Sequence, residues 1–349
     1  ESLSDIWLDR FFSPKNINNM NYDEVYSLPN VSPIDAVGIM KQKERGEIRG
    51  TFELKNSPGL SYYGYKNILD FIKFKKQEGQ GFHFRYSTLF KTLPITTNPD
   101  EEGNSDLLIS NNDPETLHRL NLFFGNHFKV GLLYHQNMGE SKGIYTDKVS
   151  LTFDNIDLSS SLSLNKIIVG NYNAVFGQGV IMETTDYFSP RRTGYGFTKR
   201  AEGISPDLSR SSQYLMQGVA TQYTFDISSS SNIRFTQFLS LHPRDAIINQ
   251  DGSFCSLITM QPRLDWGVNQ DQNKIHHPLT SSVNELTWGG NVRLSPTLSS
   301  SVGFTFYESL YDRALDASRS QILGTILGGD DPSYSGDEYY GNYITNSAD

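Results

Sequence analysis

Residues Ser163 to Met182 read SLNKIIVGNYNAVFGQGVIM, and this stretch decides the fold that we expect. Its first half continues an alternation of apolar and polar residues that starts at Leu162, which predicts a β-strand. Its second half places three glycines among aromatic and amide residues. Glycine inside a strand pattern indicates a bulge, a bend or a close approach of two backbones. We therefore expect a long strand that is bent by its glycines.

The sequence on both sides of this stretch also has the two-residue period of β-strands. The runs 82–86, 120–124 and 128–134 alternate in this way, and Gly125-Asn126-His127 between the last two predicts a hairpin turn. Similar runs are 215–225, 233–241, 286–294 and 302–307. Strands of about ten residues can cross a bilayer when they are tilted. Short turns alternate with long polar connections, a pattern typical of membrane β-barrels.

Composition narrows the function classes. The 349 residues contain no apolar run of 18, so the sequence predicts no transmembrane helix, and the mean hydropathy of −0.45 suits a protein with many polar strand positions. The formal net charge of −9 gives no general attraction to nucleic acid. Cys255 is the single cysteine, which excludes an internal disulfide.

An internal repeat precedes the strands. Residues 1–15 read as a short amphipathic lead, and from residue 16 to 79 the segment 23–39 can be laid on the segment 52–68 at an offset of 29. Each copy reads helix, tight hairpin, helix. Pro29 and Pro58 end the first helix of each copy, and Ser32 and Ser61 cap the second. We expect a small all-α module over residues 16–79.

The two hairpins carry the first resemblance. Their positions are Pro29, Asn30, Val31, Ser32 and Pro58, Gly59, Leu60, Ser61. They resemble the helix-hairpin-helix motif, and the paired form is similar to the module of competence-type DNA receptors. In that family the hairpin glycines let backbone amides approach a DNA phosphate.

Here three of the four hairpin glycines are replaced, by Asn30, Ser32 and Ser61. Residues 13–78 hold ten Lys or Arg residues against eight Asp or Glu residues, which is too small a surplus for strong phosphate binding. Each added Cβ also restricts the close backbone approach that amide donation requires. We therefore expect the module to dock a protein partner or to plug the barrel, and we do not favour DNA as its ligand.

The opening stretch carries the second resemblance. Its signature residues are Gly170, Asn171, Tyr172, Phe176, Gly177, Gln178 and Gly179. They resemble the Gly-Asp-Tyr and Phe-Gly-Gln-Gly signature of outer-membrane β-barrel proteins of the Bacteroidetes and Chlorobi lineage, which carry helix-hairpin-helix repeats at their N-terminus. The segments 203–206 and 217–220 recur there in the same order. Asn171 stands where the family has an acidic residue.

The resemblance covers about residues 16–310 and implies an architecture and a location. The fold class that we expect is a small all-α double helix-hairpin-helix module followed by a transmembrane antiparallel β-barrel over residues 80–349. The implied location is the bacterial outer membrane, with the N-terminal module in the periplasm. Because bacterial barrels close with an even strand number and the sequence ends in a Gly- and Asp-rich segment, we expect the barrel to be incomplete at its C-terminus.

No pattern of catalytic, metal-binding or cofactor-binding residues is recognised. We therefore expect a non-enzymatic outer-membrane barrel, alone or as a subunit of a larger envelope complex, whose partners are outer-membrane lipid and envelope proteins. Two alternatives remain open. One is a DNA-uptake or DNA-binding channel, and the other is a barrel hydrolase with an unrecognised Ser, His and acid set.

Alternation also predicts which side chains face lipid. A slip of one residue would turn basic side chains towards the bilayer, at a cost of about 2–4 kcal/mol each near its midplane. The residues expected to face lipid are Leu120, Leu122, Phe124, Phe128, Val130, Leu132, Val302, Phe304 and Phe306. Those expected in the lumen are Arg119, Asn121, Lys129, Arg234 and Arg293.

Overall fold

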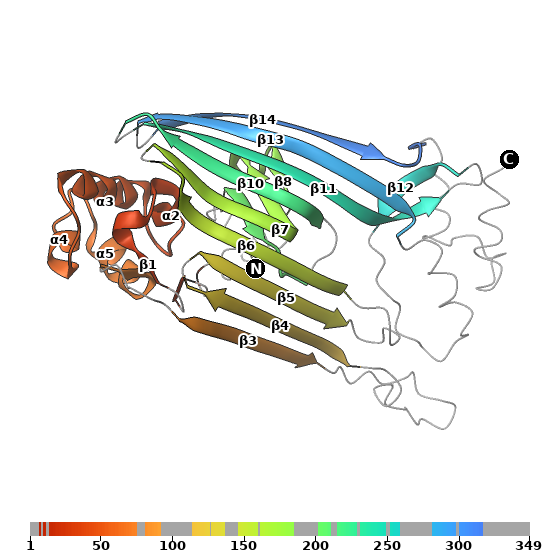
Figure 1. The fold of residues 1–349 in the computed structure, drawn as a ribbon, viewed down its shortest axis with the longest axis horizontal. Coiled ribbons are helices and arrows are strands. Elements are labelled where there is room, and N and C mark those ends of the chain that lie inside the picture. The colour runs from red at the N-terminus through yellow and green to blue at the C-terminus, as the bar shows by residue number, and fades with distance from the viewer. Residues whose placement is uncertain are drawn as a thin grey trace, which may run out of the picture.

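The structure is a computed structural model of the 349-residue chain. It describes residues 7, 10–11, 14–74, 81–91, 114–125, 127–136, 146–159, 161–184, 202–210, 215–228, 231–248, 252–258, 281–297 and 300–316. A large antiparallel β-sheet dominates this part of the chain, and short helices precede it (Figure 1). The prediction of a β-rich fold is confirmed.

Apart from residues 7 and 10–11 and a single turn at Gly177–Gly179, the described helices lie in an N-terminal helical segment, residues 14–74. Its elements are β1 (Lys15–Asn16), η1 (Ile17–Asn19), α2 (Tyr22–Tyr26), α3 (Pro33–Arg45), α4 (Thr51–Lys55), α5 (Tyr62–Ile68), η2 (Leu69–Phe71) and β2 (Ile72–Lys73). Strands β1 and β2 pair in parallel and join the two ends of the segment. The segment is therefore not purely helical.

The predicted helix starts at Ser32 and Ser61 are confirmed. The Ser32 hydroxyl accepts a hydrogen bond from the Asp35 amide, Pro33 follows at the first helical position, and Ser61 accepts from the Gly64 amide. The apolar residues of the repeat form a core of their own: Ile17, Met20, Val25, Leu28, Val31, Ala36, Ile39, Met40, Ile48, Leu54, Ile68 and Ile72. Burial of this core is what holds such short helices together.

The sheet is a meander in which most neighbours in space are also neighbours in sequence. The order is β14-β13-β11-β10-β7-β6-β5-β4-β3, all antiparallel. The strands are β3 (Phe82–Lys91), β4 (Glu115–Phe124), β5 (Phe128–Gln136), β6 (Thr146–Asp157), β7 (Leu162–Phe176), β10 (Met216–Asp226), β11 (Asn232–Ile248), β13 (Val283–Thr297) and β14 (Ser300–Tyr311). Three short strands lie off this path: β8 (Met182–Glu183) and β9 (Gly203–Pro206) on β7, and β12 (Phe254–Ile258) on β11.

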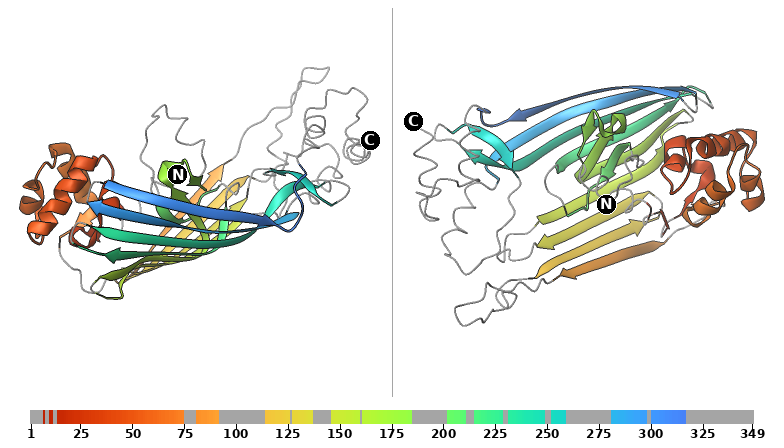
Figure 2. Two further views of the ribbon diagram at one scale, coloured as in Figure 1. Left: turned by 90° about the horizontal axis from the view of Figure 1, so that it is seen from above. Right: turned by 180° about the vertical axis from the view of Figure 1, so that it is seen from behind.

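Over the described residues the sheet is open, with β3 and β14 as its edges. It curves into a trough rather than closing into a barrel (Figure 2). The prediction of a β-barrel therefore holds only as far as an antiparallel, curved sheet. The expectation for the end of the chain falls on residues 317–349, which lie outside the described residues.

In the described part of the sheet, the strand ends that are joined by the shortest connections share one end. The connections 125–127, 158–161, 227–231 and 298–299 join β4–β5, β6–β7, β10–β11 and β13–β14. Because consecutive strands are antiparallel, these turns share the end at which β3 begins. The N-terminal helical segment also lies there (Figure 1). Strands β3, β5, β7 and β11 end at the opposite end of the sheet, where the strands β4, β6, β10 and β13 begin.

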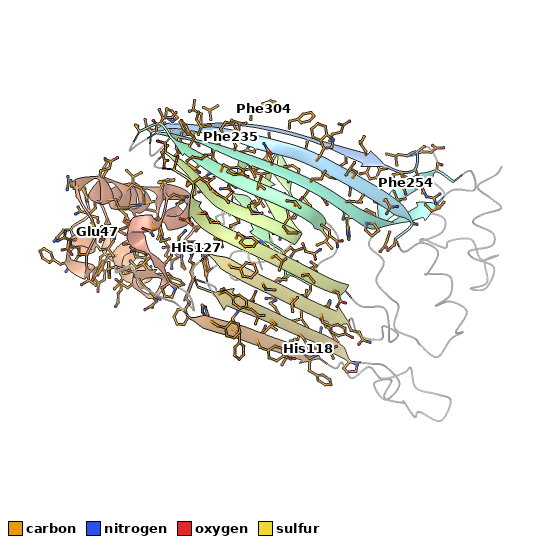
Figure 3. All side chains as sticks on the ribbon, in the orientation of Figure 1. Glu47, His118, His127, Phe235, Phe254 and Phe304 are labelled. Atoms are coloured by element: carbon orange, nitrogen blue, oxygen red, sulfur yellow. The ribbon has the colours of Figure 1, made fainter. Side chains whose placement is uncertain are left out.

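The convex face of the sheet is apolar and exposed. The register aligns apolar residues across the strands, for example Phe84 with Leu122 and Val292 with Phe304. Phe84, Val302 and Phe304 are exposed by 64%, 73% and 71%. Further members are Phe82, Tyr86, Leu120, Phe124, Phe128, Val130, Leu132, Val149, Phe153, Val169, Val219, Phe235, Leu239, Trp288, Leu294 and Phe306, and Figure 3 labels Phe235 and Phe304. We call this surface the outer face.

The predicted alternation is confirmed by the register. Arg119, Asn121 and Lys129 lie on the opposite, concave face, since each is adjacent in its strand to an outer-face residue. Arg234 and Arg293 lie opposite each other on that same concave face. We call it the inner face.

The bend expected in the opening stretch occurs at Gly170 in β7. Gly170 has a φ of 106°, and a Cβ built there would lie 2.1 Å from the Val149 carbonyl oxygen. Its partner Gly218 in β10 would bring a Cβ equally close to the Leu239 carbonyl oxygen. Beyond this glycine pair, residues 172–176 of β7 pair with β9 and β8 on the concave side of the sheet (Figure 2).

Candidate functional site

The inner face buries polar side chains, in contrast to the core of an ordinary globular protein. Residues exposed by less than 10% include Glu115, Asn121, His135, Lys148, Ser150, Thr152, Gln222, Thr224, Arg234, Thr236, Ser240, Glu285, Thr287 and Asn291. In the described part of the sheet, buried polar side chains that could take part in binding or chemistry therefore lie on the inner face.

A segment of chain covers part of the inner face. We call residues 202–210 the inner strap; it begins with Glu202, forms β9 and ends at Arg210. Ile204 packs in a core with Tyr172, Phe238 and other buried residues. Lys166 of β7 donates a hydrogen bond to the Ile204 carbonyl. The strap is thus attached to β7 at its first half.

The middle of the strap is held by a buried ion pair. The Lys148 ammonium donates to Asp207 Oδ2 at 2.8 Å, and the two side chains are exposed by 0% and 3%. The Asp207 amide donates to the Asn171 carbonyl, and Asp207 Oδ1 accepts from the Ser209 amide. These bonds satisfy a charge pair that would be costly to bury alone.

The second half of the strap reaches β5 and β4. Leu208 packs with Leu117 and Leu133, and a Cβ built on Gly131 would lie 2.5 Å from Leu208 Cδ1. The glycine therefore leaves the room that the leucine fills. Arg210 forms an ion pair of 3.1 Å with Glu115, which also bonds His135 at 3.3 Å.

The strap meets the N-terminal helical segment at a cluster of four charges. Arg234 of β11 lies 2.6 Å from Asp23 Oδ2 of α2, and Arg293 of β13 lies 3.4 Å from Asp23 Oδ1. Arg293 also donates to Glu202 at 2.8 Å. We call these residues, Asp23, Glu202, Arg234 and Arg293, the charge cluster. It joins α2, two strands and the strap, in sequence up to 270 residues apart.

The signature residues lie where β7 leaves the sheet and the chain passes onto the inner face. Gly170 makes the bend, the Asn171 side chain accepts from the Val149 amide, and Tyr172 is fully buried. Phe176 stacks on Phe238. Gly177, Gln178 and Gly179 form the helical turn η4 (Gly177–Gly179) that follows β7. Their role in the structure is to turn the chain onto the inner face.

The hairpin residues lie together in the helical segment. Pro29 and Asn30 connect α2 to α3, and Pro58 and Gly59 connect α4 to α5. Asn30 has a φ of 55° and Gly59 a φ of 79°, so the replacement of glycine by asparagine keeps the left-handed turn. Val31 is buried, Leu60 packs against the same core, and Ser32 and Ser61 are the two helix caps.

A single carboxylate ties the two hairpins together. Asp35 Oδ2 accepts hydrogen bonds from the Ser32 amide and hydroxyl at 2.9 and 2.6 Å, and Oδ1 accepts from the Ser61 amide at 2.7 Å. Burial opposes ionisation of Asp35, but the bonds from Ser32 and Ser61 outweigh it and lower the pKa. Gly64 leaves the space for this carboxylate, because a Cβ there would lie 2.7 Å from Asp35 Cγ.

Replacing Asp35 with alanine should destabilise the helical segment by about 2 kcal/mol, since both helix starts lose a bonding partner. Thermal unfolding of the full chain followed at Trp7, whose indole donates to the Ser27 carbonyl, measures this change. Glu44→Ala, an exposed site in the same helix, is the matched control and should shift the transition little. Equal shifts for both variants would contradict the bridging role of Asp35.

Glu24 makes the helical segment sensitive to acid. Burial raises its pKa, but the charges of Lys15 and Arg10 outweigh this and lower the pKa from 4.5 to about 2. Because the folded pKa lies below the unfolded one, ionised Glu24 stabilises the fold above pH 4.5, and this stabilisation is lost as the pH falls towards 2. Glu24→Gln should therefore flatten the pH dependence of the unfolding midpoint between these values. Parallel curves for the variant and the parent protein would count against it, and Glu44→Gln serves as the control.

Several of these residues carry no signal in the sequence. Lys148 and Asp23 look like ordinary polar positions of a strand and a helix, and Asp207 follows a proline in a polar stretch. The segment 203–206 stands out in the sequence through its resemblance alone, and that resemblance is the one feature of the sequence that points to the strap. These charged residues are far apart in the sequence. The strand topology brings them together, and no local sequence pattern predicts that they pair.

Two features are absent from the described residues. No three His, Cys, Asp or Glu side chains in the ranges given above are grouped so as to hold a metal ion. Among the helices of those ranges, none is long and apolar enough to cross a membrane.

Comparisons with known proteins identified no relative of this chain. No family model, no curated protein and no solved structure matches this chain.

Proposed function

We propose that this chain is a non-enzymatic outer-membrane β-barrel protein of the type that it resembles, with a double helix-hairpin-helix module in the periplasm. The observation that supports this most is the distribution of side chains on the sheet, which is the reverse of that in a water-soluble protein. Large apolar side chains cover the exposed outer face, whereas charged and amide side chains are buried on the inner face. An exposed apolar surface of this width is unstable in water and suits the acyl chains of a bilayer.

The position of the helical segment supports its location. Short turns face the periplasm in bacterial outer-membrane barrels, and long loops face outward. The helical segment lies at the end that carries the short turns 125–127, 158–161, 227–231 and 298–299. In this proposal the segment closes or braces the periplasmic mouth through Asp23, and its exposed side is left to dock an envelope protein.

Exposed apolar side chains on the helical segment support the docking role. Ile34, Phe52, Tyr62 and Tyr63 are exposed by 70%, 75%, 62% and 74%. Aromatic residues on a surface are typical of protein interfaces. These exposed apolar side chains do not require an anionic ligand such as DNA. The small surplus of positive charge in residues 13–78 agrees with this.

Trp288 gives a direct test of the membrane contact. It lies on the outer face with an exposure of 42%, next to Phe306 in an edge-to-face pair. The full chain with Trp7→Phe and Trp266→Phe retains this single tryptophan and is reconstituted into lipid vesicles. We expect brominated acyl chains to quench its fluorescence and aqueous iodide to leave it largely unchanged.

The control keeps Trp7 alone, through Trp266→Phe and Trp288→Phe, and should show no quenching by brominated lipid because Trp7 contacts the helical segment. Quenching of Trp288 by iodide, without quenching by brominated lipid, would refute the membrane-embedded outer face.

DNA capture is a second candidate, and the turn shape at Asn30 and Gly59 favours it. Both residues hold the left-handed conformation that a phosphate-binding hairpin requires. The full chain would then bind duplex DNA at micromolar or lower concentration at physiological salt. That binding would weaken steeply with salt and be lost in Gly59→Val. We expect no such binding, and its detection would replace protein docking by DNA capture.

A further inference from the structure

We infer that the N-terminal helical segment and the inner strap compete for one pair of arginines, so that docking of the helical segment loosens the strap. The inference goes beyond the proposed function, because it concerns how two segments of the chain influence each other and does not require a membrane.

The arginine pair is the fixed part of the charge cluster. Arg234 and Arg293 are register partners on β11 and β13, with side chains exposed by 9% and 19%. Like charges placed directly opposite each other destabilise a sheet unless anions lie between them. The sheet alone therefore presents two adjacent positive charges to whatever anions can reach them.

The two anions come from separate parts of the chain. Asp23 approaches from α2, bonding Arg234 most closely at 2.6 Å, and Glu202 approaches from the strap, bonding Arg293 at 2.8 Å. Arg293 Nη1 serves both, since it also lies 3.4 Å from Asp23 Oδ1. Two carboxylates on one nitrogen divide its attraction and repel each other.

The sign of the coupling follows from these charges. With Asp23 in place the cluster is neutral, and each carboxylate is opposed by the other. Without the Asp23 charge, Glu202 is the single anion of the cluster facing two cations, so its attraction to them rises at the short distances of a partly buried site. Loss of Asp23 therefore tightens the strap, and by reciprocity loss of Glu202 tightens the docking of α2.

The rest of the strap makes this change observable. Residues 203–206 pair with β7, and the Asp207 amide donates to the Asn171 carbonyl, so the strap contains backbone amides whose exchange with solvent reports its opening. Anchors at Asp207 and Arg210 hold its far end, whereas Glu202 holds the end next to the helical segment. Opening that starts at Glu202 should appear first at Gly203 and Ile204.

Hydrogen exchange of the full chain in detergent micelles tests the coupling. In Asp23→Asn we expect the amides of residues 203–207 to exchange about fivefold more slowly than in the parent protein. In Glu202→Gln they should exchange faster, and the double variant should match Glu202→Gln. Asp23→Glu keeps the charge, and Asp70→Asn removes an exposed acid elsewhere in the segment; both should leave the strap unchanged.

The reciprocal measurement guards against misfolding of one variant. In Glu202→Gln the Ser27 amide, which bonds the Asp23 carbonyl at the end of α2, should exchange more slowly. Amides of α3 report whether the helical segment remains folded in each variant. Unchanged or faster strap exchange in folded Asp23→Asn, or unchanged Ser27 exchange in Glu202→Gln, overturns the inference while leaving the Trp288 result untouched.

Discussion

Replacing Asp207 with alanine is expected to lower the free energy of unfolding by about 3–5 kcal/mol, because it removes the carboxylate that lies 2.8 Å from the buried Lys148 ammonium. Lys148 is fully buried, and the Ser209 hydroxyl, to which it also donates at 3.4 Å, carries no charge. Urea unfolding of the full chain in detergent micelles, followed at Trp288, measures the change.

The double variant Lys148→Met with Asp207→Leu is the matched comparison for this pair. Apolar side chains of similar size remove the buried ammonium together with its partner carboxylate, so most of the lost stability should return. A single variant as stable as the parent protein, or a double variant no better than the single one, would show that the pair is solvated and does not anchor the strap.

Gly170→Ala is expected to cost at least about 3 kcal/mol, the range of a substitution that strains the backbone and breaks local pairing. The added Cβ would lie 2.1 Å from the Val149 carbonyl oxygen, and the φ of 106° is unfavourable for alanine. Neither strain is relieved without parting β6 from β7. Gel electrophoresis without heating measures this loss. If the chain folds as proposed, its compact form should migrate faster than the heated chain, and most of the variant should lack that form.

Gly303→Ala provides the control for this prediction. It lies in β14, and the nearest atom to an added Cβ is Asn291 Nδ2 at 3.7 Å, an ordinary contact. Its cost should stay within about 1 kcal/mol, as for a strand position with room for a methyl group. If both variants migrate as the parent protein does, Gly170 is not required for the bend in β7.

The parts of the fold that could be predicted from the sequence have local causes. Alternation placed Leu120 and Arg119 on opposite faces, since neighbouring strand residues must point apart. Serine followed by proline or tyrosine marked the starts of α3 and α5, because a hydroxyl satisfies an otherwise unpaired helix amide. Such signals lie within a few residues of the feature that they predict.

The contacts that hold the inner strap against the inner face could not be predicted, because the residues that make them lie far apart in the sequence. Lys148 and Asp207 are 59 residues apart, and each alone would be expected on a solvated surface. The interpretation of Asn30 as a lost glycine was incomplete for a different reason. Asparagine tolerates a left-handed φ, so the turn persists although the residue type changes.

The placement of the inner strap in the chain has a consequence for the order of assembly. Its far anchors, Glu115 of β4 and Lys148 of β6, precede it in the sequence, whereas Arg293 follows Glu202 by 91 residues. Strands joined by short turns close at small entropic cost, so we expect the wall that receives Asp207 and Arg210 to form independently of the strap. The Glu202 end also requires β13. We therefore expect the strap to be seated in two stages, with the end next to the helical segment fastened last.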